Sequence, residues 1–263
     1  MENSIKRTAK RIFASRNKNI TDLDSPDRFW EIRNTIKKKS ALHYLYLEVY
    51  KKYLDCIKRS PSGKIVEIGS GAGFVKELIP NIITTDIVAY SGIDKTLDAT
   101  KMDFLDCSLS CICMFNVLHH IPNTPAFFQE ALRCLAPGGR LFMVEPYPGW
   151  IGALVYRYLH HEPYDPHVKQ WEFESKGPVS DANNALPYVI FERDIKKFRL
   201  LFPDFSIERF ETHTPLRYWL AGGLKKWSLL PSWVFNFATW VDRKLIQISP
   251  KFGSFVNIEL VKR

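Results

Sequence analysis

Short apolar segments separated by turn residues follow one another through most of this chain, and they restrict the folds open to it. After the turn at residues 60–63, strand character is found at 64–68, 82–87, 93–97, 109–115, 140–145, 205–212 and 255–261. Helices are expected at 124–135 and at about 192–201. This alternation predicts an α/β fold with a mostly parallel sheet. The link 88–92 is too short for a crossover helix, so the sheet is expected to be trimmed there.

The first 60 residues form a basic segment with 15 Lys or Arg against 7 Asp or Glu, which is +8 of the total charge of +9. Residues 1–35 predict a short helix followed by a loop, with a turn at Ser25-Pro26-Asp27. From Leu42 to Ile57, apolar residues recur at helical spacing and predict an amphipathic helix. We therefore expect a basic helical extension, 1–60, and a main domain, 61–263, whose insertions 147–190 and 213–253 lie near the ligand crevice.

Cysteine content and charge restrict the compartment and the partners. Five unevenly placed cysteines and no recognisable apolar leader predict a reduced, cytoplasmic protein. The most apolar window, 227–241, is shorter than a bilayer span and contains Pro231, so no transmembrane helix is expected. The basic extension can favour nucleic acid, an anionic membrane surface or an acidic substrate, although such charge is more often a solvated helix face.

One short run carries the sharpest chemical signal. The sequence Ile65-Val66-Glu67-Ile68-Gly69-Ser70-Gly71-Ala72-Gly73 joins a predicted strand to a glycine turn, and a helix is expected after it. Glycines have no Cβ, so their backbone N–H groups can approach a nucleotide-like ligand closely. A dinucleotide fingerprint requires Gly or Ala at position 74, where this chain has Phe74. A nicotinamide-dependent oxidoreductase is therefore disfavoured.

Residues 64–146 resemble the class I S-adenosylmethionine-dependent methyltransferases, in the form of a methyltransferase type 11-like domain. Asp86 ends the second predicted strand, where this family places an acid that accepts hydrogen bonds from both ribose hydroxyls. Asp98-Ala99 is similar to the pair beside the adenine amino group, with Asp94 and Asp103 as neighbouring alternatives. Residues 116–121 resemble the family's loop near the methionine part of the cofactor, and 133–140 resemble its lead-in to the fifth strand.

This resemblance implies a Rossmann-like fold with a seven-stranded, mostly parallel sheet and an antiparallel last strand, plus N-terminal helices and two lid-like insertions. It also implies S-adenosylmethionine as the cofactor. The residues that it places at the cofactor are Glu67, Gly69, Ser70, Gly71, Gly73, Asp86, Ile87, Asp98, Ala99 and Asn116. Because the helix after Asp86 is missing, the adenine side is expected to be less enclosed than in the fuller fold.

Candidate groups for the chemistry follow the fourth strand. Methyl transfer from a sulfonium mainly requires alignment and exclusion of water, and a base is needed only if the acceptor must lose a proton. His119 and His120 are the candidate bases because histidine titrates near neutral pH. Alternatively, one of them caps the loop or packs under the cofactor. Glu145 and the pair His160-His161 are further candidates on the acceptor side.

Two features bear on the acceptor. Asn116 is not followed by Pro-Pro and an aromatic residue, the loop with which several amino-group methyltransferases hold a planar nitrogen. This favours O- or C-methylation of a small-molecule, sugar or lipid-linked acceptor. Segment 171–187 and the aromatic tail resemble methyltransferases of bacterial surface-polysaccharide or glycolipid synthesis. If it is helical from Ser232, the tail either packs against the sheet, which is favoured, or lies peripherally in the inner face of a membrane.

No metal site is expected from the sequence. Cys107, Cys111 and Cys113 lack zinc-site spacing and predict strand packing, and the histidines at 160, 161 and 167 are not spaced as a helix-borne pair. The favoured interpretation is a methyltransferase, and the alternative is a non-catalytic scaffold with this fold that is attached to a membrane or a partner. Nucleic acid is disfavoured because no reading motif is present. No partner protein is indicated.

Overall fold

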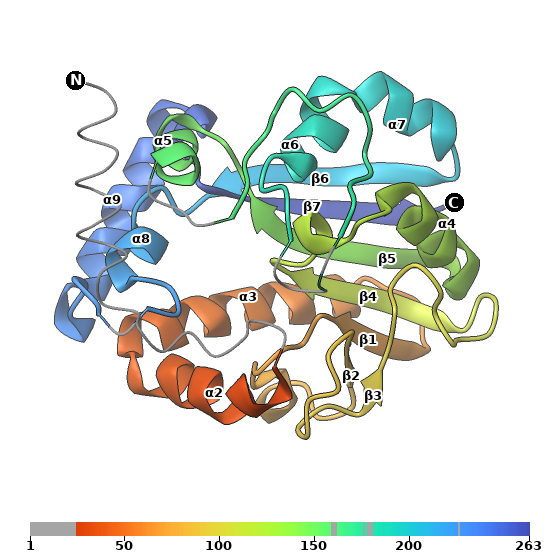
Figure 1. Ribbon diagram of the computed structural model, residues 1–263, viewed down its shortest axis with the longest axis horizontal. Helices are drawn as coiled ribbons and strands as arrows, with labels where there is room; N and C mark the ends of the chain where they lie inside the picture. The colour runs from red at the N-terminus through yellow and green to blue at the C-terminus, as the bar shows by residue number, and fades with distance from the viewer. Residues whose placement is uncertain (1–24, 159–161, 176, 178–180, 226) are drawn as a thin grey trace.

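The computed structural model describes residues 25–158, 162–175, 177, 181–225 and 227–263, and a mixed sheet of seven strands lies at its centre (Figure 1). The strand order is β3-β2-β1-β4-β5-β7-β6. Strands β1 to β5 pair in parallel, and β7 is antiparallel to both β5 and β6, which confirms the predicted sheet. The strands are β1 (Lys64–Ile68), β2 (Ile83–Asp86), β3 (Lys95–Thr96), β4 (Leu109–Phe115), β5 (Leu135–Pro146), β6 (Phe205–His213) and β7 (Phe255–Lys262).

Two N-terminal helices, α2 (Phe29–Lys38) and α3 (Ser40–Lys58), cover one face of the sheet (Figure 1). The apolar stripe of α3 packs against side chains of β1, β4 and β5 that point to this face, and the amphipathic prediction is confirmed. Its Cys56 Sγ lies 3.8 Å from the Sγ of Cys111. Cys111 and Cys113 are fully buried free thiols, as expected for cysteines that pack as small apolar residues.

Helix α2 stands where the sequence predicted a loop, and that prediction was wrong. The turn at Ser25 is in fact a helix start, because the Ser25 side chain caps the 3-10 turn η1 (Pro26–Arg28), which continues into α2. Phe29 and Ile36 face inward and are each 1% exposed. The Nη1 of Arg33 donates a hydrogen bond to the carbonyl oxygen of Gly73 at 2.9 Å, so α2 is attached to the glycine turn.

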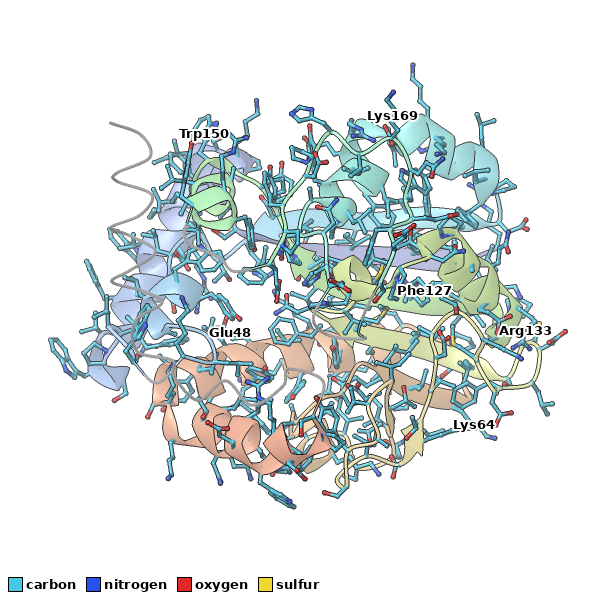
Figure 2. The ribbon with its side chains drawn as sticks, viewed as in Figure 1. Glu48, Lys64, Phe127, Arg133, Trp150 and Lys169 are labelled. Carbon is cyan, nitrogen blue, oxygen red and sulfur yellow. The ribbon has the colours of Figure 1, made fainter. Side chains whose placement is uncertain are left out.

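The opposite face is covered by α4 (Thr124–Cys134), α6 (Leu186–Tyr188), the π-turn η4 (Val189–Arg193) and α7 (Ile195–Leu201). The helical stretch begins at Leu186, earlier than the predicted start near 192, because Leu186 and Val189 continue its buried stripe. The ring of Phe128 on α4 contacts those of Phe191 and Phe198. Its neighbour Phe127, labelled in Figure 2, is also fully buried. Aromatic packing thus joins η4 and α7 to α4.

The connections between β1, β2 and β3 are unusually short. Only a 3-10 turn, η2 (Val75–Glu77), follows the glycine turn, so the expected helix there was wrong. The reason is that Pro80 and the start of β2 at Ile83 leave too few residues for a longer helix. The structure has no helix between β2 and β3, as predicted.

Strand β5 begins earlier than the sequence suggested. The predicted turn 136–139 belongs to β5, whose first residue Leu135 pairs with Leu109 of β4. The register shifts between Leu109 and Cys111, and Gly138 has a φ of 76°. A positive φ in a strand is readily adopted by glycine, so the turn residues form an irregular strand entry instead of a loop.

Beyond the carboxyl ends of the parallel strands lie α5 (Trp150–Tyr158), α8 (Arg217–Ala221), η5 (Ser232–Val234), α9 (Phe235–Ile248) and η6 (Pro250–Phe252) (Figure 1). The buried Arg217 joins three of the helices, because it donates to Asp242 of α9 at 2.8 Å and to Glu48 of α3 at 2.7 Å. Among the helices of the described residues, none has the length and hydropathy needed to cross a bilayer.

The sequence favoured burial of the aromatic tail, and this prediction is correct for only one side of α9. Phe235 and Ala238 are buried against α3 and α8. In contrast, Trp233 is 84% exposed, Phe237 62% and Trp240 55%. The reason is that Asp242, which shares the inner side with Phe235 and Ala238, pairs with Arg217 there, so the bulkiest rings face outward.

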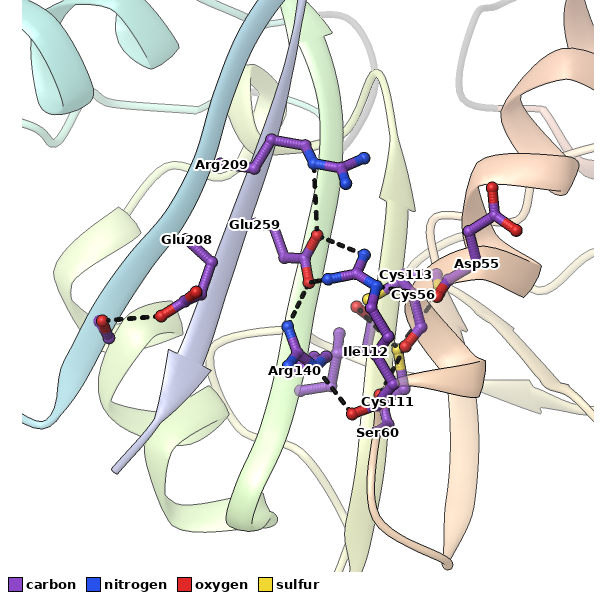
Figure 3. Close-up of polar contacts among 12 residues, drawn as sticks. Asp55, Cys56, Ser60, Cys111, Ile112, Cys113, Arg140, Glu208, Arg209 and Glu259 are labelled. Carbon is purple, nitrogen blue, oxygen red and sulfur yellow. Dashed lines mark hydrogen bonds and ion pairs between the residues drawn. The ribbon is translucent and has the colours of Figure 1, made fainter.

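A buried carboxylate on β7, the strand between β5 and the edge strand β6, is the centre of an ion-pair cluster (Figure 3). Glu259 is 0% exposed and accepts hydrogen bonds from both terminal nitrogens of Arg59, at 2.5 and 2.7 Å, and from Arg140. Arg209 lies 3.7 Å away. The guanidinium groups balance the charge and hold the pKa of Glu259 below its usual value, although burial opposes this. This cluster is remote from the carboxyl ends of β1 and β4.

Candidate cofactor and acceptor site

In the glycine turn after β1, Gly69 is packed against a neighbouring side chain, whereas Gly71 has open space beside it. Gly69 and Gly71 have φ values of 68° and 49°, a region that L residues with side chains rarely adopt. A Cβ on Gly69 would lie 2.3 Å from Cγ2 of Val117, whereas a Cβ on Gly71 would meet nothing within 4 Å. Gly69 therefore allows the turn to pack on the loop after β4. Gly71 leaves its backbone open to a ligand.

Asp86, at the end of β2, is hydrogen-bonded to the glycine turn. Its Oδ2 accepts a hydrogen bond from Gly71 N–H at 2.8 Å, and its Oδ1 accepts one from Val88 N–H at 3.0 Å. Burial raises the pKa of Asp86, although these two hydrogen bonds act in the opposite direction. Ser70 strengthens the attachment, because its N–H donates to Thr85 O at 2.8 Å. Next to Asp86, the apolar Ile87 is 45% exposed and offers a surface on which a flat ring can pack.

Asp98 and Ala99 lie just beyond β3, the strand that pairs with β2. Leu97 N–H donates to Asp86 O at 2.8 Å, which brings the two carboxyl ends together. The exposed carboxylate of Asp98 accepts from Thr100 N–H at 2.8 Å. The alternative acids are engaged elsewhere, Asp94 with Lys76 and Asp103 with Lys95. No ion pair engages Asp98 within the described ranges, so it is the acid of the three that is best placed for a ligand.

Two buried oxygen atoms at the ends of β1 and β4 have no hydrogen-bond partner among the described residues. They are Oε2 of Glu67 and Oδ1 of Asn116. Burial, with a smaller contribution from the charge of Asp86, raises the pKa of Glu67 to about 7. Asn116 has a φ of 56°, a conformation that asparagine adopts more readily than most residues. Because unpaired buried acceptors are costly, this pair fits a ligand that brings hydrogen-bond donors or a positive charge.

His119 and His120 lie on the 3-10 turn η3 (Leu118–His120) and have different surroundings. The Nδ1 of His119 is 2.7 Å from Oε2 of Glu145, whose Oε1 accepts from Val117 N–H and Leu118 N–H. Burial lowers the pKa of His119, but Glu145 and Glu162 outweigh it and raise the pKa to about 9. Burial and the neighbouring charge of His119 lower the pKa of His120 to about 4.

A mainly apolar pocket lies on the α3 face beside Phe115, the last residue of β4. Leu45 and Tyr218 are among the residues that line its wall. Lys52 lies at its polar side, where its Nζ donates to Asn257 Oδ1 at 3.0 Å and is 3.4 Å from Nε2 of His213. Burial lowers the pKa of Lys52 to about 8. The pocket is small, with room for little more than about one water molecule.

Comparison with known proteins decides the family. A family model described as a methyltransferase domain matches residues 40–188, more than half of the chain. The chain belongs to this family. The methyltransferase therefore uses S-adenosylmethionine as its cofactor, and the open glycine turn and the two unpaired buried oxygens fit that group. No curated protein sequence matches the chain.

Solved structures share the fold of the methyltransferase. One is a SAM-dependent methyltransferase from Thermotoga maritima, described as a possible histamine N-methyltransferase. It is 15% identical with a TM-score of 0.51, over 89% of this chain and 100% of that one. A geranyl diphosphate C-methyltransferase from Streptomyces coelicolor is 14% identical with a TM-score of 0.47, over 84% of this chain and 82% of that one. At these identities the likeness concerns the fold alone.

In the structure of the methyltransferase, two residues that the sequence did not indicate lie near the candidate site or the pocket. Glu162 approaches both histidines of η3, and Lys52 reaches the pocket from α3. No motif marks either residue, because each comes from a segment with no fixed spacing to β4. Glu145, by contrast, was expected and does contact His119. The candidates His160 and His161 lie outside the described residues.

Proposed function

We propose that the protein is an active methyltransferase that transfers the methyl group of S-adenosylmethionine to an oxygen or carbon of a small-molecule, sugar or lipid-linked acceptor. The observation that carries this proposal is the open Gly71 backbone, hydrogen-bonded to Asp86, beside the unpaired oxygens of Glu67 and Asn116. A scaffold that had lost the cofactor would not need buried acceptors without partners, since each costs stability.

Each part of the cofactor has a matching group in this proposal. Asp86 binds the ribose hydroxyls, while Ile87, Asp98 and Ala99 surround the adenine. Glu67 and Asn116 face the methionine end, where their oxygens accept hydrogen bonds from the ammonium group. The glycine turn, with Gly69, Ser70, Gly71 and Gly73, forms the backbone surface between the two ends. When bound, the cofactor supplies the activated methyl group, so the chain itself has to position the acceptor and exclude water.

The acceptor side of this proposal is the polar cluster of His119, His120, Glu145 and Glu162. The pocket lies on the α3 face at the ends of β4 and β5, whereas Glu145 points to the other face, because successive strand residues alternate. The pocket, which has room for little more than about one water molecule, is therefore not part of the acceptor site in this proposal. His119 and His120 act where a hydroxyl acceptor has to lose its proton.

Calorimetric titration with S-adenosylhomocysteine tests the cofactor site. We expect micromolar binding by the wild type and at least tenfold weaker binding by Asp86→Ala, a loss of about 1.4 kcal/mol or more. The matched control is Asp103→Ala, because Asp103 is an exposed acid that pairs with Lys95. Transfer of labelled methyl groups to candidate hydroxyl acceptors then tests catalysis. Absence of binding by the wild type at millimolar ligand would favour the non-catalytic scaffold.

An exposed aromatic surface supports an acceptor held at a membrane. On η5 and α9 it comprises Trp233, Phe237 and Trp240, and the rings of Phe237 and Trp240 stack with centroids 5.8 Å apart. Trp150, 58% exposed, projects from α5 (Figure 2) and contacts Phe252 of η6, which follows α9. Lys244 lies one turn beyond Trp240 and is exposed. Aromatic side chains with a cation on one helix face suit an interface with anionic lipid.

Vesicle sedimentation tests this surface. The proposal is a cytoplasmic protein that associates peripherally with the inner membrane face, so vesicles with phosphatidylglycerol should sediment it better than neutral phosphatidylcholine vesicles. Combined replacement of Trp233, Phe237 and Trp240 by Ser should remove most of the binding. Trp30→Ser is the matched control, because Trp30 is 60% exposed but lies on α2, away from this surface. Equal binding of the triple variant and the wild type would contradict the membrane proposal.

A further inference from the structure

Three side chains with metal-binding atoms converge beside the end of β4. Nε2 of His119 lies 3.7 Å from Oε2 of Glu162, and Nε2 of His120 lies 3.8 Å from Oε1 of the same carboxylate. Their ligand atoms all lie within 4.8 Å of one another. His119 is buried, and His120 and Glu162 are each 16% exposed at the side chain. The group combines neighbouring residues of η3 with one from the segment after α5.

The other ring nitrogens show which atoms of the histidines are available. Nδ1 of His120 is 3.0 Å from the carbonyl oxygen of Asp181, which can only accept, so this nitrogen is a donor. Nδ1 of His119 faces Glu145, whose other oxygen already accepts two backbone hydrogen bonds. Each Nδ1 is therefore committed to its own partner, so Nε2 is the ring nitrogen of each histidine that faces Glu162.

The spacing of these groups leaves room for a cation between them. Two ring nitrogens face the two oxygens of one carboxylate, at separations longer than a hydrogen bond. In a tetrahedral site with metal–ligand bonds of about 2.1 Å, adjacent ligand atoms are about 3.4 Å apart. The observed separations therefore need only a small contraction. Oε2 of Glu162 is also held by the Nδ2 of Asn184 at 3.0 Å, so the carboxylate is oriented toward the histidines.

We propose that His119, His120 and Glu162 bind one divalent transition-metal ion through their Nε2 atoms and the carboxylate. Glu145 and the carbonyl of Asp181 are then outer groups that fix the rings, as is usual for histidine ligands. Two imidazoles and one carboxylate favour Zn²⁺, Co²⁺, Fe²⁺ or Mn²⁺ over Mg²⁺ and Ca²⁺. No spacing of residues in the sequence indicated this site, because the expected absence of metal was argued from other cysteines and histidines.

Three protein ligands leave one coordination position of the metal open. The role that we infer for this position rests on the proposed function and deepens it. A hydroxyl of the acceptor occupies this position, and the cation lowers the pKa of the hydroxyl so that its proton leaves to solvent. The oxygen then attacks the methyl carbon of the cofactor. The carbon–sulfur bond breaks, its electron pair stays on sulfur, and the products are a methyl ether and S-adenosylhomocysteine. His119 and His120 thus handle the acceptor's proton through the metal instead of acting as bases.

Titration of chelator-treated, full-length protein with Co²⁺ tests metal binding without any need for methyl transfer. Visible absorption reports the coordination of Co²⁺, and calorimetry gives the stoichiometry and Kd. We expect one ion per chain in the wild type, with at least tenfold weaker binding, about 1.4 kcal/mol, in Glu162→Gln and in His120→Asn. His167→Asn is the matched control, since His167 is exposed in the same inserted segment and outside the group. Circular dichroism checks that each variant is folded.

Two results would overturn the proposal. One is a wild type that shows no stoichiometric Co²⁺ or Zn²⁺ binding. The other is binding that Glu162→Gln and His120→Asn leave unchanged while both remain folded. S-adenosylhomocysteine binding is measured separately on the metal-free protein. A failed cofactor titration with intact metal binding would contradict the proposed function alone, whereas the reverse result would contradict only the metal site.

Discussion

Replacement of Glu67 by Gln should stabilise the protein in the absence of its cofactor, and the effect should appear only at higher pH. In the unfolded chain this carboxyl ionises near 4.5, whereas burial raises its pKa in the folded protein to about 7. Folding therefore favours the protonated form, and wild-type stability falls as the pH rises from about 4.5 through 7. Each pH unit corresponds to about 1.4 kcal/mol, so the full cost of ionising Glu67 is about 3 kcal/mol.

Urea unfolding at two pH values measures this effect. At about pH 3.5, well below both pKa values, the carboxyl is neutral in the folded and in the unfolded chain, so variant and wild type should have similar free energies of unfolding. At pH 8.5 we expect Glu67→Gln to be more stable by about 3 kcal/mol. Exposed Glu208 provides the control, and its Gln variant should show no such pH-dependent gain. An equal difference between Glu67→Gln and the wild type at both pH values would refute the reasoning.

Three further results are expected. Gly69→Ala should lower the free energy of unfolding by at least about 2 kcal/mol, since its Cβ meets Val117, as chemical unfolding can show. Gly71→Ala, with open space around the same atom, should cost about 1 kcal/mol in stability and instead weaken S-adenosylhomocysteine binding in calorimetry. Arg217→Ala should cost about 3 to 5 kcal/mol in thermal unfolding because it leaves Asp242 buried and unpaired, whereas loss of the exposed Lys76 should cost less than about 1. Similar stability costs for Gly69→Ala and Gly71→Ala, or for loss of Arg217 and loss of Lys76, would contradict these assignments.

The sheet was predictable because its signals are local. Strand segments end at turn residues, and the glycine turn with Asp86 identifies the order of the first strands through the family resemblance. Helix α2 was missed because a Ser-Pro-Asp turn and a capped helix start share the same residues. The early start of the helical stretch at Leu186 was missed because its apolar stripe is short and interrupted by the π-turn η4.

Residues of the candidate site were predictable only where they belong to a single sequence motif. Glu67 and Asn116 stand at the ends of strands, and one side-chain oxygen of each is buried without a hydrogen-bond partner among the described residues. Glu162 was not predictable, because its approach to His119 depends on how a long insertion returns across the sheet. Periodicity also could not decide which side of α9 is buried, because Asp242 finds a partner in Arg217 from another helix.

The contacts of helix α2 bear on where the functional domain of this protein begins. The segment shared with the family starts at residue 40, inside α3, yet Arg33 and Phe29 lie before it. Arg33 donates a hydrogen bond to Gly73 O, and Phe29 packs with Ala72 of the turn and with Val88 after β2. A chain cut at the similarity boundary would keep every strand but lose the helix that contacts the glycine turn. Its defect would appear as weak cofactor affinity in a folded protein, so the minimal functional chain has to be defined by binding and not by resemblance.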